Sequence, residues 1–262
     1  GFVIFGVAAN VSVTKLFLAG IFPGIWLALG LWLTWWWTTR KEKLETPPRR
    51  SSAEVFQALR EAGWALTLPL IIIVGLRMGV FTPTEAAVVA AVFAMFVAGV
   101  IYRELSWAQL YQTFEAAAKT TAVVMFLVAA AMVSAWLITV AQLPAQVVQL
   151  LSPLLDSPTL LMFAIMALVI VVGTAMDMTP TILILTPVLM PLVKAAGIDP
   201  VYFGVMFIIN NSIGLVTPPV GTVLNAVAGV GRMKMDDVTR GVMPFMIVQF
   251  VVMFLMVLFP QL

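Results

Sequence analysis

The sequence has no cysteine and no histidine among its 262 residues. Without cysteine there is no disulfide framework, thiol nucleophile or thiolate metal site. Without histidine the commonest general base and the commonest metal ligand are also missing. Only 10% of the residues are charged, whereas an average soluble domain carries about 25%. So few charges cannot cover a water-soluble globule of this size, which excludes a soluble enzyme, a nucleic-acid-binding protein and a disordered chain.

What the sequence does contain is apolar: 62% of the residues are hydrophobic, and the mean hydropathy is +1.09. The formal net charge of +2 is too small to indicate a nucleic-acid partner. The 16 methionines are scattered, which is typical of core filling rather than of a metal path. The composition predicts an all-α polytopic membrane protein embedded in the lipid bilayer.

Apolar runs of about 20 residues mark the predicted crossings. We expect residues 1–262 to form a single transmembrane domain, with a half-helix and a span in 1–39, a cytoplasmic loop over 40–61, spans within 62–140 that include an amphipathic interfacial helix over 104–118, and a last span over 240–262. The basic residues of 40–61 set this orientation through the positive-inside rule, and so do Arg232, Lys234 and Arg240. The C-terminus is therefore expected on the outer side.

Two segments do not behave as simple spans. Residues 158–196 are apolar but too long for one helix, and Gly173–Thr181 interrupts them. Two full spans here would reverse the positive-inside pattern, so we expect a re-entrant helical hairpin with its tip near Asp177. In 201–230, the adjacent Pro218 and Pro219 prevent a continuous helix. Unwound backbone at membrane depth is tolerated where it is buried or lines a cavity, and a broken helix facing a hairpin is typical of ion-coupled transporters.

Several residues have a structural alternative. Asp177 is either a helix cap or a functional carboxylate, since a charge at the bilayer centre costs about 2.5–3.5 kcal/mol on insertion scales. Asn210, Asn211 and Ser212 are either site residues or partners in interhelical hydrogen bonds. For Glu85 we favour a capping box with Thr82 as N-cap and Pro83 at the first helical position.

The same residues leave three functional alternatives to a cation-coupled transporter. A proton-coupled carrier would have to use Asp177, the one ionisable residue in the centre of the hairpin. A scaffold or assembly subunit would use the two breaks for packing alone. An intramembrane hydrolase lacks a second carboxylate opposite Asp177 and has no histidine, so we expect no enzyme activity.

Long motifs then indicate a family. The chain resembles the large membrane subunit of tripartite ATP-independent periplasmic (TRAP) transporters, of the DctM type, over essentially its whole length. The motifs that carry the resemblance are Val11–Gly24, Gly79–Ala87, Gly173–Pro191 and Gly197–Gly221.

This resemblance implies an ion-transporter-superfamily-like elevator fold in the bacterial inner membrane. It implies sodium-coupled uptake of organic anions, such as C4-dicarboxylates or sialic acids, with Na⁺ as the coupling ion and no other cofactor. The implied partners are a small membrane subunit of the DctQ type and a periplasmic substrate-binding protein. Since Gly1–Ala8 aligns with Gly221–Ala228, we expect a C-terminal portion of the family's subunit, with the first inverted repeat largely missing.

The resemblance to this family also implies which residues form the binding sites. It implies a sodium site between the hairpin tip and the broken helix, with backbone carbonyls as most of the ligands, at Gly173, Met176, Asp177, Gly214, Thr217, Pro219, Gly221 and Thr222. On the substrate side it points to Met178, Thr179, Thr181 and Asn225.

Overall fold

The computed structural model describes residues 1–40, 50–142, 157–218 and 221–260, together with the single positions 146, 149 and 155. Its secondary structure over these residues is helical, with no strand in the part of the chain described. The chain divides into two compact units, one formed by Gly1–Glu42 with Val124–Leu262 and the other by Lys43–Val123. The prediction of an all-α chain is therefore confirmed.

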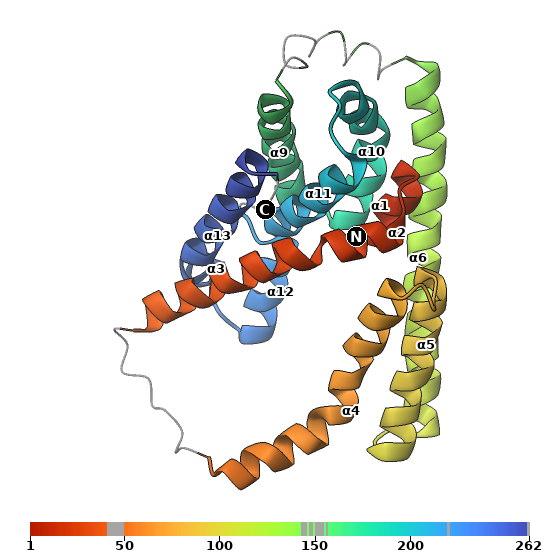
Figure 1. The fold of residues 1–262 in the computed structure, drawn as a ribbon, viewed down its shortest axis with the longest axis vertical. Coiled ribbons are helices and arrows are strands. Elements are labelled where there is room, and N and C mark those ends of the chain that lie inside the picture. Colours follow the sequence, from red (N-terminus) through yellow and green to blue (C-terminus); the bar gives the residue numbers. More distant parts are fainter. Residues whose placement is uncertain are drawn as a thin grey trace. The chain divides into compact units, whose positions relative to one another are not determined.

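Figure 1 shows the helices, labelled and coloured in the order of the sequence. The first unit holds α1 (Phe2–Ala9), α2 (Val13–Ala19), α3 (Ile21–Thr39), α9 (Pro158–Ala175), α10 (Met178–Ala195), α11 (Pro200–Leu215), α12 (Thr222–Gly231) and α13 (Met235–Leu258). The second holds α4 (Ser52–Arg77), α5 (Pro83–Phe96) and the π-helix η1 (Val97–Ile101). Helix α6 (Trp107–Val140) belongs to both, since the boundary between the units lies within it.

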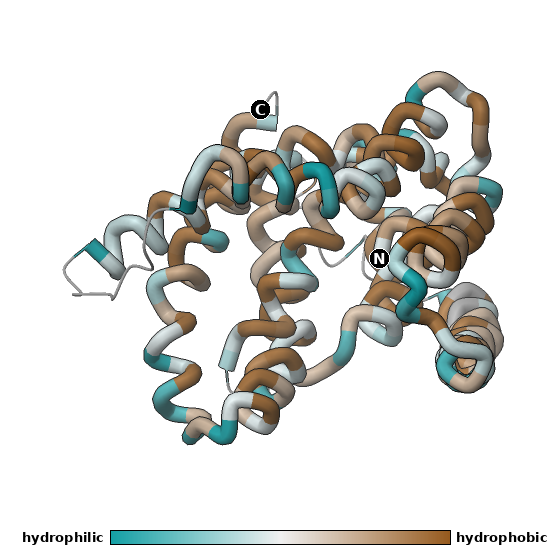
Figure 2. The backbone as a smooth tube through the Cα atoms, turned by 90° about the horizontal axis from the view of Figure 1, so that it is seen from below, coloured by the Kyte–Doolittle hydropathy of each residue, from teal (hydrophilic) through white to brown (hydrophobic). Residues whose placement is uncertain are grey.

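Seven helical segments in the described part of the chain are long and apolar enough to cross a membrane. The first of them, Val13–Thr39, joins α2 and α3, and both helices around Asp177 qualify by length and composition. Figure 2 shows long hydrophobic stretches along the helices. Many large apolar side chains, such as Trp37 and Val171, are exposed. A helix that is apolar on its outward face is suited to lipid, so the chain is a multi-pass membrane protein.

The core of the first unit forms where α11 lies against α9, α10 and the N-terminal helices. Phe5, Phe203 and Phe207 are fully buried there, and the Phe5 and Phe207 rings lie 5.8 Å apart. On the other side, α3 packs against α13 through Gly30, where an added Cβ would lie 3.0 Å from Val248. These contacts hold α9, α10 and α11 together and so position the segments between them.

Helix α4 begins earlier than the sequence analysis predicted. Residues 52–61 were assigned to a cytoplasmic loop over 40–61, but they form the first ten residues of this helix. The Ser51 side chain caps the helix by accepting a hydrogen bond from the backbone N of Glu54 at 3.3 Å, and Arg50 forms an ion pair with Glu54. The N-cap at Ser51, and not the charge of the segment, determines where α4 begins. Residues 41–49 of the predicted loop lie outside the described residues.

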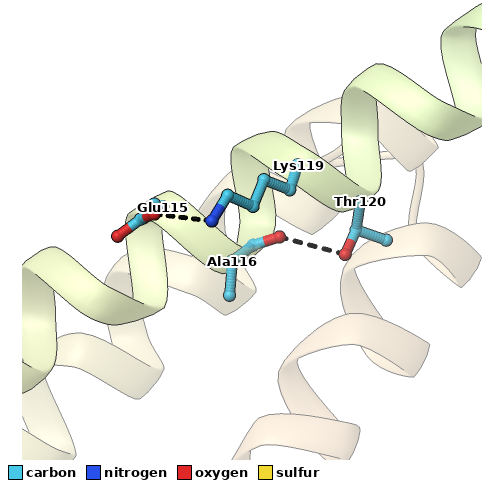
Figure 3. Close-up of polar contacts among 4 residues, drawn as sticks. All are labelled: Glu115, Ala116, Lys119 and Thr120. Atoms are coloured by element: carbon cyan, nitrogen blue, oxygen red, sulfur yellow. Dashed lines mark hydrogen bonds and ion pairs between the residues drawn. The ribbon is translucent and has the colours of Figure 1, made fainter.

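Helix α6 differs from the prediction in a second way. An interfacial helix over 104–118 was expected to end before a separate span, yet one helix runs through this point. Figure 3 shows why the helix continues: Lys119 Nζ lies 2.6 Å from Glu115 Oε1, and the Thr120 hydroxyl donates to the Ala116 carbonyl at 3.0 Å. The partners in each pair are four residues apart, and the pairs span the predicted boundary between residues 118 and 119. No glycine or proline interrupts the helix at this boundary.

The start of α5 confirms the predicted capping box. Thr82 is the N-cap and Pro83 follows it, while the Glu85 carboxylate accepts from the Thr82 backbone N at 2.8 Å. The Thr82 hydroxyl in turn accepts from the Glu85 backbone N at 3.3 Å. Glu85 therefore has a structural role at the beginning of a helix.

Candidate functional site

The turn between α9 and α10 is only two residues long. Met176 is extended at φ −118° and ψ 149°, and Asp177 occupies the N-cap position of α10. The Asp177 carbonyl accepts hydrogen bonds from the Thr181 backbone N at 3.2 Å and from its hydroxyl at 2.8 Å. The Asp177 carboxylate is exposed and makes no capping hydrogen bond. The capping alternative therefore does not account for this side chain.

The second break separates α11 from α12. Helix α11 ends at Leu215, and the Thr217 hydroxyl folds back to donate to the Ile213 carbonyl at 2.7 Å. Gly221 has φ +45°, and a Cβ there would lie 3.2 Å from the Thr217 carbonyl oxygen. Both features favour glycine, which has no Cβ and adopts positive φ readily. Pro219, predicted to belong to the sodium site, lies outside the described residues.

The two breaks meet in the first unit. The Gly221 backbone N donates to the Thr174 carbonyl at 3.4 Å, which joins the end of α9 to the start of α12. Nearby, α9 and α11 approach through a pair of glycines: a Cβ on Gly214 would lie 2.9 Å from the Gly173 Cα. The structure thus brings together Gly173, Gly214 and Gly221 from the predicted sodium-site set. We call the region formed by Gly173–Met178, Asn211, Ile213–Pro218 and Gly221 the junction.

Asn211 lies inside the junction and is fully buried. Its side-chain Nδ2 donates to the Met178 carbonyl at 3.2 Å, which links α11 to the first residue of α10. Its Oδ1 is buried and has no hydrogen-bond partner among the described residues. A Cβ added to Gly173 would lie 3.3 Å from this oxygen. An unpaired buried acceptor costs about 1–3 kcal/mol, so this oxygen needs an explanation beyond helix packing.

Asn210 shows the same pattern one residue earlier. Its Nδ2 donates to the Met166 carbonyl at 2.7 Å, and its buried Oδ1 lacks a partner among the described residues. Both asparagines therefore make the interhelical bonds that the sequence offered as one alternative. Ser212, in contrast, is exposed and bonds within its own helix, to the Ile208 carbonyl at 2.9 Å.

The other predicted residues surround the junction less closely. Met178 is half-buried beneath Gly1, where an added Cβ would lie 3.1 Å from the Met178 sulfur. Thr181 is fully buried, and its hydroxyl is already bonded to Asp177. Three further residues line the edges of the two breaks: half-buried Thr179 in α10, and exposed Thr222 and Asn225 in the first turn of α12.

Two groups of the junction were absent from the predicted set. They are the Asn211 side chain, which was left between two alternatives, and the Thr174 carbonyl. The sequence contains a signal for Asn211, because two consecutive asparagines within an apolar helix place two polar amide groups among apolar neighbours. The sequence could not show which amide group would remain unpaired.

The chemistry available at the junction comes from oxygen. Backbone carbonyls, the Asn211 amide oxygen and the hydroxyls of Thr217 and Thr222 are the oxygen donors in or beside it. In the described part of the chain there is no cluster of three acidic, histidine or cysteine side chains able to hold a metal. Neutral oxygen donors suit a hard cation of low charge better than a transition metal. The fold and the junction are therefore those of a polytopic helical membrane protein with two interrupted segments facing each other.

Comparison with known proteins gives the family. The whole chain, residues 1–262, matches the family described as "Tripartite ATP-independent periplasmic transporter, DctM component". The chain belongs to this family of transporter permeases, as its resemblance predicted.

Curated relatives carry the same kind of name. The chain is 56% identical over 261 residues to the 2,3-diketo-L-gulonate TRAP transporter large permease protein YiaN of Escherichia coli K12, covering 100% of this chain and 61% of that protein. It is 38% identical over 259 residues to the sialic acid permease SiaM of Vibrio cholerae, covering 99% and 61%. It is 34% identical over 258 residues to the C4-dicarboxylate permease DctM of Pseudomonas aeruginosa, covering 98% and 60%. The chain thus spans about three fifths of the length of these relatives.

Proposed function

We propose that this chain is the C-terminal portion of a permease that uses a sodium gradient to take up organic anions. The observation that carries the proposal is the buried Oδ1 of Asn211 beside Gly173, where the two interrupted segments meet; this oxygen has no hydrogen-bond partner in the part of the chain that the structure describes. A desolvated oxygen without a donor is stabilised by a cation, and Na⁺ is a hard ion that prefers oxygen ligands. This supports a cation as the missing partner.

The junction gives the ion a mechanical consequence. Asn211 already ties α11 to α10 through Met178, and Gly221 ties α12 to α9 through Thr174. A cation bound among these groups would strengthen both links and hold the α9–α10 hairpin against the broken helix. The ordered edge that results would accept the anion next to Met178, Thr179, Thr181 and Asn225. We propose the re-entrant, elevator-type arrangement on the same grounds.

The glycines of the junction keep the carbonyl groups accessible. With side chains at Gly173 or Gly214 the two helices would move apart, because an added Cβ at Gly214 lies only 2.9 Å from backbone atoms. Half-helix ends at membrane depth also contribute partial charges: C-terminal carbonyls favour a cation and N-terminal amides favour an anion. The ends of α9 and α11 carry the former and the starts of α10 and α12 carry the latter.

The relatives support a carboxylate as the transported anion, since they are named for diketogulonate, sialic acid and C4-dicarboxylate. We propose 2,3-diketo-L-gulonate as the first substrate to test, because the relative named for it is 56% identical to this chain. The family description, tripartite and periplasmic, supports a small membrane subunit and a periplasmic binding protein as partners.

The test is uptake by the complete permease, reconstituted in liposomes with its small subunit and binding protein. We expect labelled carboxylate to accumulate with an inward sodium gradient and not when potassium replaces sodium, and to require the binding protein. Uptake that is indifferent to sodium would reject the coupling ion. Uptake that does not need the binding protein would reject the tripartite assembly.

Asp177 separates sodium coupling from proton coupling. If protons drive uptake, Asp177→Asn removes the carboxylate that carries them and abolishes accumulation in a pH gradient. If sodium drives uptake, the variant retains a sodium-dependent signal, because oxygen donors from Asn211 and the backbone remain. A scaffold role predicts a third result: neither Asp177→Asn nor Thr217→Ala changes uptake by the complete system.

A further inference from the structure

The second unit contains a groove of its own. It has a volume of about 630 Å³ and is lined by one face of α4, by Ile101 at the end of the π-helix η1 and by the following residue, Tyr102. The lining residues from α4 are spaced by three or four positions, so they form one side of the helix. Half of this side is apolar or aromatic, namely Ala53, Phe56 and Trp64.

The groove is fixed by a contact between two elements that are distant in sequence. The Tyr102 hydroxyl donates to the Glu61 carbonyl at 2.6 Å, which holds the end of η1 against α4. The wide π turn leads into this contact, with the Tyr102 backbone N bonded to the Val97 carbonyl at 2.9 Å. A π-helical turn is rare and is often found at functional positions. The next residue, Arg103, turns the chain away at φ +55°.

The position of the groove along the helices points to the membrane surface. The apolar part of α4 begins near Trp64, and η1 ends an apolar segment of 19 residues that starts at Pro83. Both segments therefore leave the hydrophobic region at the level of the groove. Exposed Trp64 and Tyr102 mark the same level, since tryptophan and tyrosine favour the membrane–water interface.

The groove carries one charge of each sign. Arg60 lines it and forms no ion pair within the described ranges of the chain. Glu61 lines it as well: its Oε1 accepts from Gln57 Nε2 at 3.0 Å, which leaves its second carboxylate oxygen available. A guanidinium next to a free carboxylate oxygen recognises a ligand that is itself zwitterionic, while a ligand with only negative charge meets repulsion from Glu61.

We propose that this groove binds a phospholipid whose headgroup carries both a phosphate and an ammonium group. Arg60 binds the phosphate, because its planar guanidinium donates paired hydrogen bonds to phosphate oxygens. Glu61 accepts from the ammonium group, which also lies against the faces of Trp64 and Tyr102. The acyl chains follow Ile101 and the apolar part of α4 beyond Trp64 into the hydrophobic region. The lipid would then bridge α4 and η1 where the structure joins them by the Tyr102 hydrogen bond.

The test uses the complete permease, purified in detergent and stripped of lipid, with native mass spectrometry to count retained lipids. The probes are phosphatidylethanolamine, which has both charges, and phosphatidylglycerol, which has the phosphate alone. We expect wild type to retain one more tightly bound phosphatidylethanolamine than Arg60→Gln does. Arg50→Gln is the matched control, because Arg50 is exposed on the same segment but does not line the groove.

A second variant tests the recognition of the ammonium group. Glu61→Gln leaves the groove with a positive charge only, so we expect phosphatidylglycerol to be retained as well as phosphatidylethanolamine. Equal retention of the two lipids by wild type would overturn the proposal. So would an identical lipid count in Arg60→Gln and wild type, or the same loss in Arg50→Gln.

Discussion

At the scale of single residues, Gly214 is the position where a side chain would do most damage to the junction. Its hydrogen occupies the space between α11 and the Gly173 backbone, and a Cβ would lie 2.9 Å from two backbone atoms of Gly173. Backbone cannot move aside as the end of a long side chain can. Close approach of two helices through small residues is common in membranes, where it maximises contact between backbones.

We expect Gly214→Ala to destabilise the complete permease by about 1–3 kcal/mol, the usual cost of overpacking a core. Thermal unfolding of the purified protein measures this. Gly229→Ala is the control, because an added Cβ there meets nothing within 4 Å and alanine is favoured over glycine in helices by about 0.5–1 kcal/mol. Equal melting temperatures for the two variants would show that the glycine contact is not tight.

The sequence predicts the glycines of the junction but not the role of Asn211. Gly173, Gly214 and Gly221 were assigned to one site from their motifs, and the structure brings them together. Asn211 was recognised as an unusual residue in an apolar helix but not assigned to the site. Whether its amide is fully paired depends on the exact crossing of α9, α10 and α11, which local sequence does not encode.

At the scale of elements, capping residues determine where helices begin. Thr82 and Glu85 share reciprocal hydrogen bonds at the start of α5. We expect Thr82→Ala to destabilise this first turn by about 0.5–2 kcal/mol, the usual loss for a removed N-cap. Hydrogen exchange should then accelerate at the amides of Glu85 and Ala86. Exposed Thr84 provides the control, since Thr84→Ala keeps the cap; acceleration of similar size in that variant would contradict the capping role.

Helix α6 allows a direct test of continuity. An uninterrupted helix rises about 1.5 Å per residue, so the Cα atoms of residues 108 and 122 should lie about 21 Å apart. The sequence has no cysteine, so Ala108→Cys with Ala122→Cys can be spin-labelled without background. We expect a single distance distribution centred near that spacing. A shorter, bimodal distribution of distances would contradict a continuous α6 and support the separate interfacial helix over 104–118.

The two elements that differed from expectation have a common cause. Charge and hydropathy indicate where the chain meets water, and they predict that membrane-spanning helices begin at Ala62 and at Lys119. Helix formation depends instead on caps and on pairs of side chains three or four residues apart, such as Ser51 with Glu54 and Glu115 with Lys119. A helix can therefore continue beyond the end of its apolar stretch, as α4 and α6 do.

At the scale of the whole molecule, the arrangement across the membrane remains a prediction from charge. Basic residues in 40–61 place that segment in the cytoplasm, and the lack of lysine and arginine in 141–157 places the latter outside. In intact cells, an impermeant thiol reagent should label Ser157→Cys directly. It should label Ser52→Cys only after the membrane is opened. The reverse pattern would invert the orientation and place the C-terminus in the cytoplasm.

We propose that a sodium ion bound beside Asn211 couples the junction to uptake. The most direct measurement is the sodium concentration that gives half-maximal uptake by the complete transporter in liposomes. Asn211→Ala removes the Oδ1 that we propose as a sodium ligand. We expect the half-maximal sodium concentration to rise about tenfold, because losing one polar contact to a charged group costs about 1.5 kcal/mol. Exposed Ser212 provides the control: its hydroxyl donates to the Ile208 carbonyl of the same helix, and Ser212→Ala should match wild type. An unchanged sodium dependence in Asn211→Ala would show that no sodium ion binds beside this side chain.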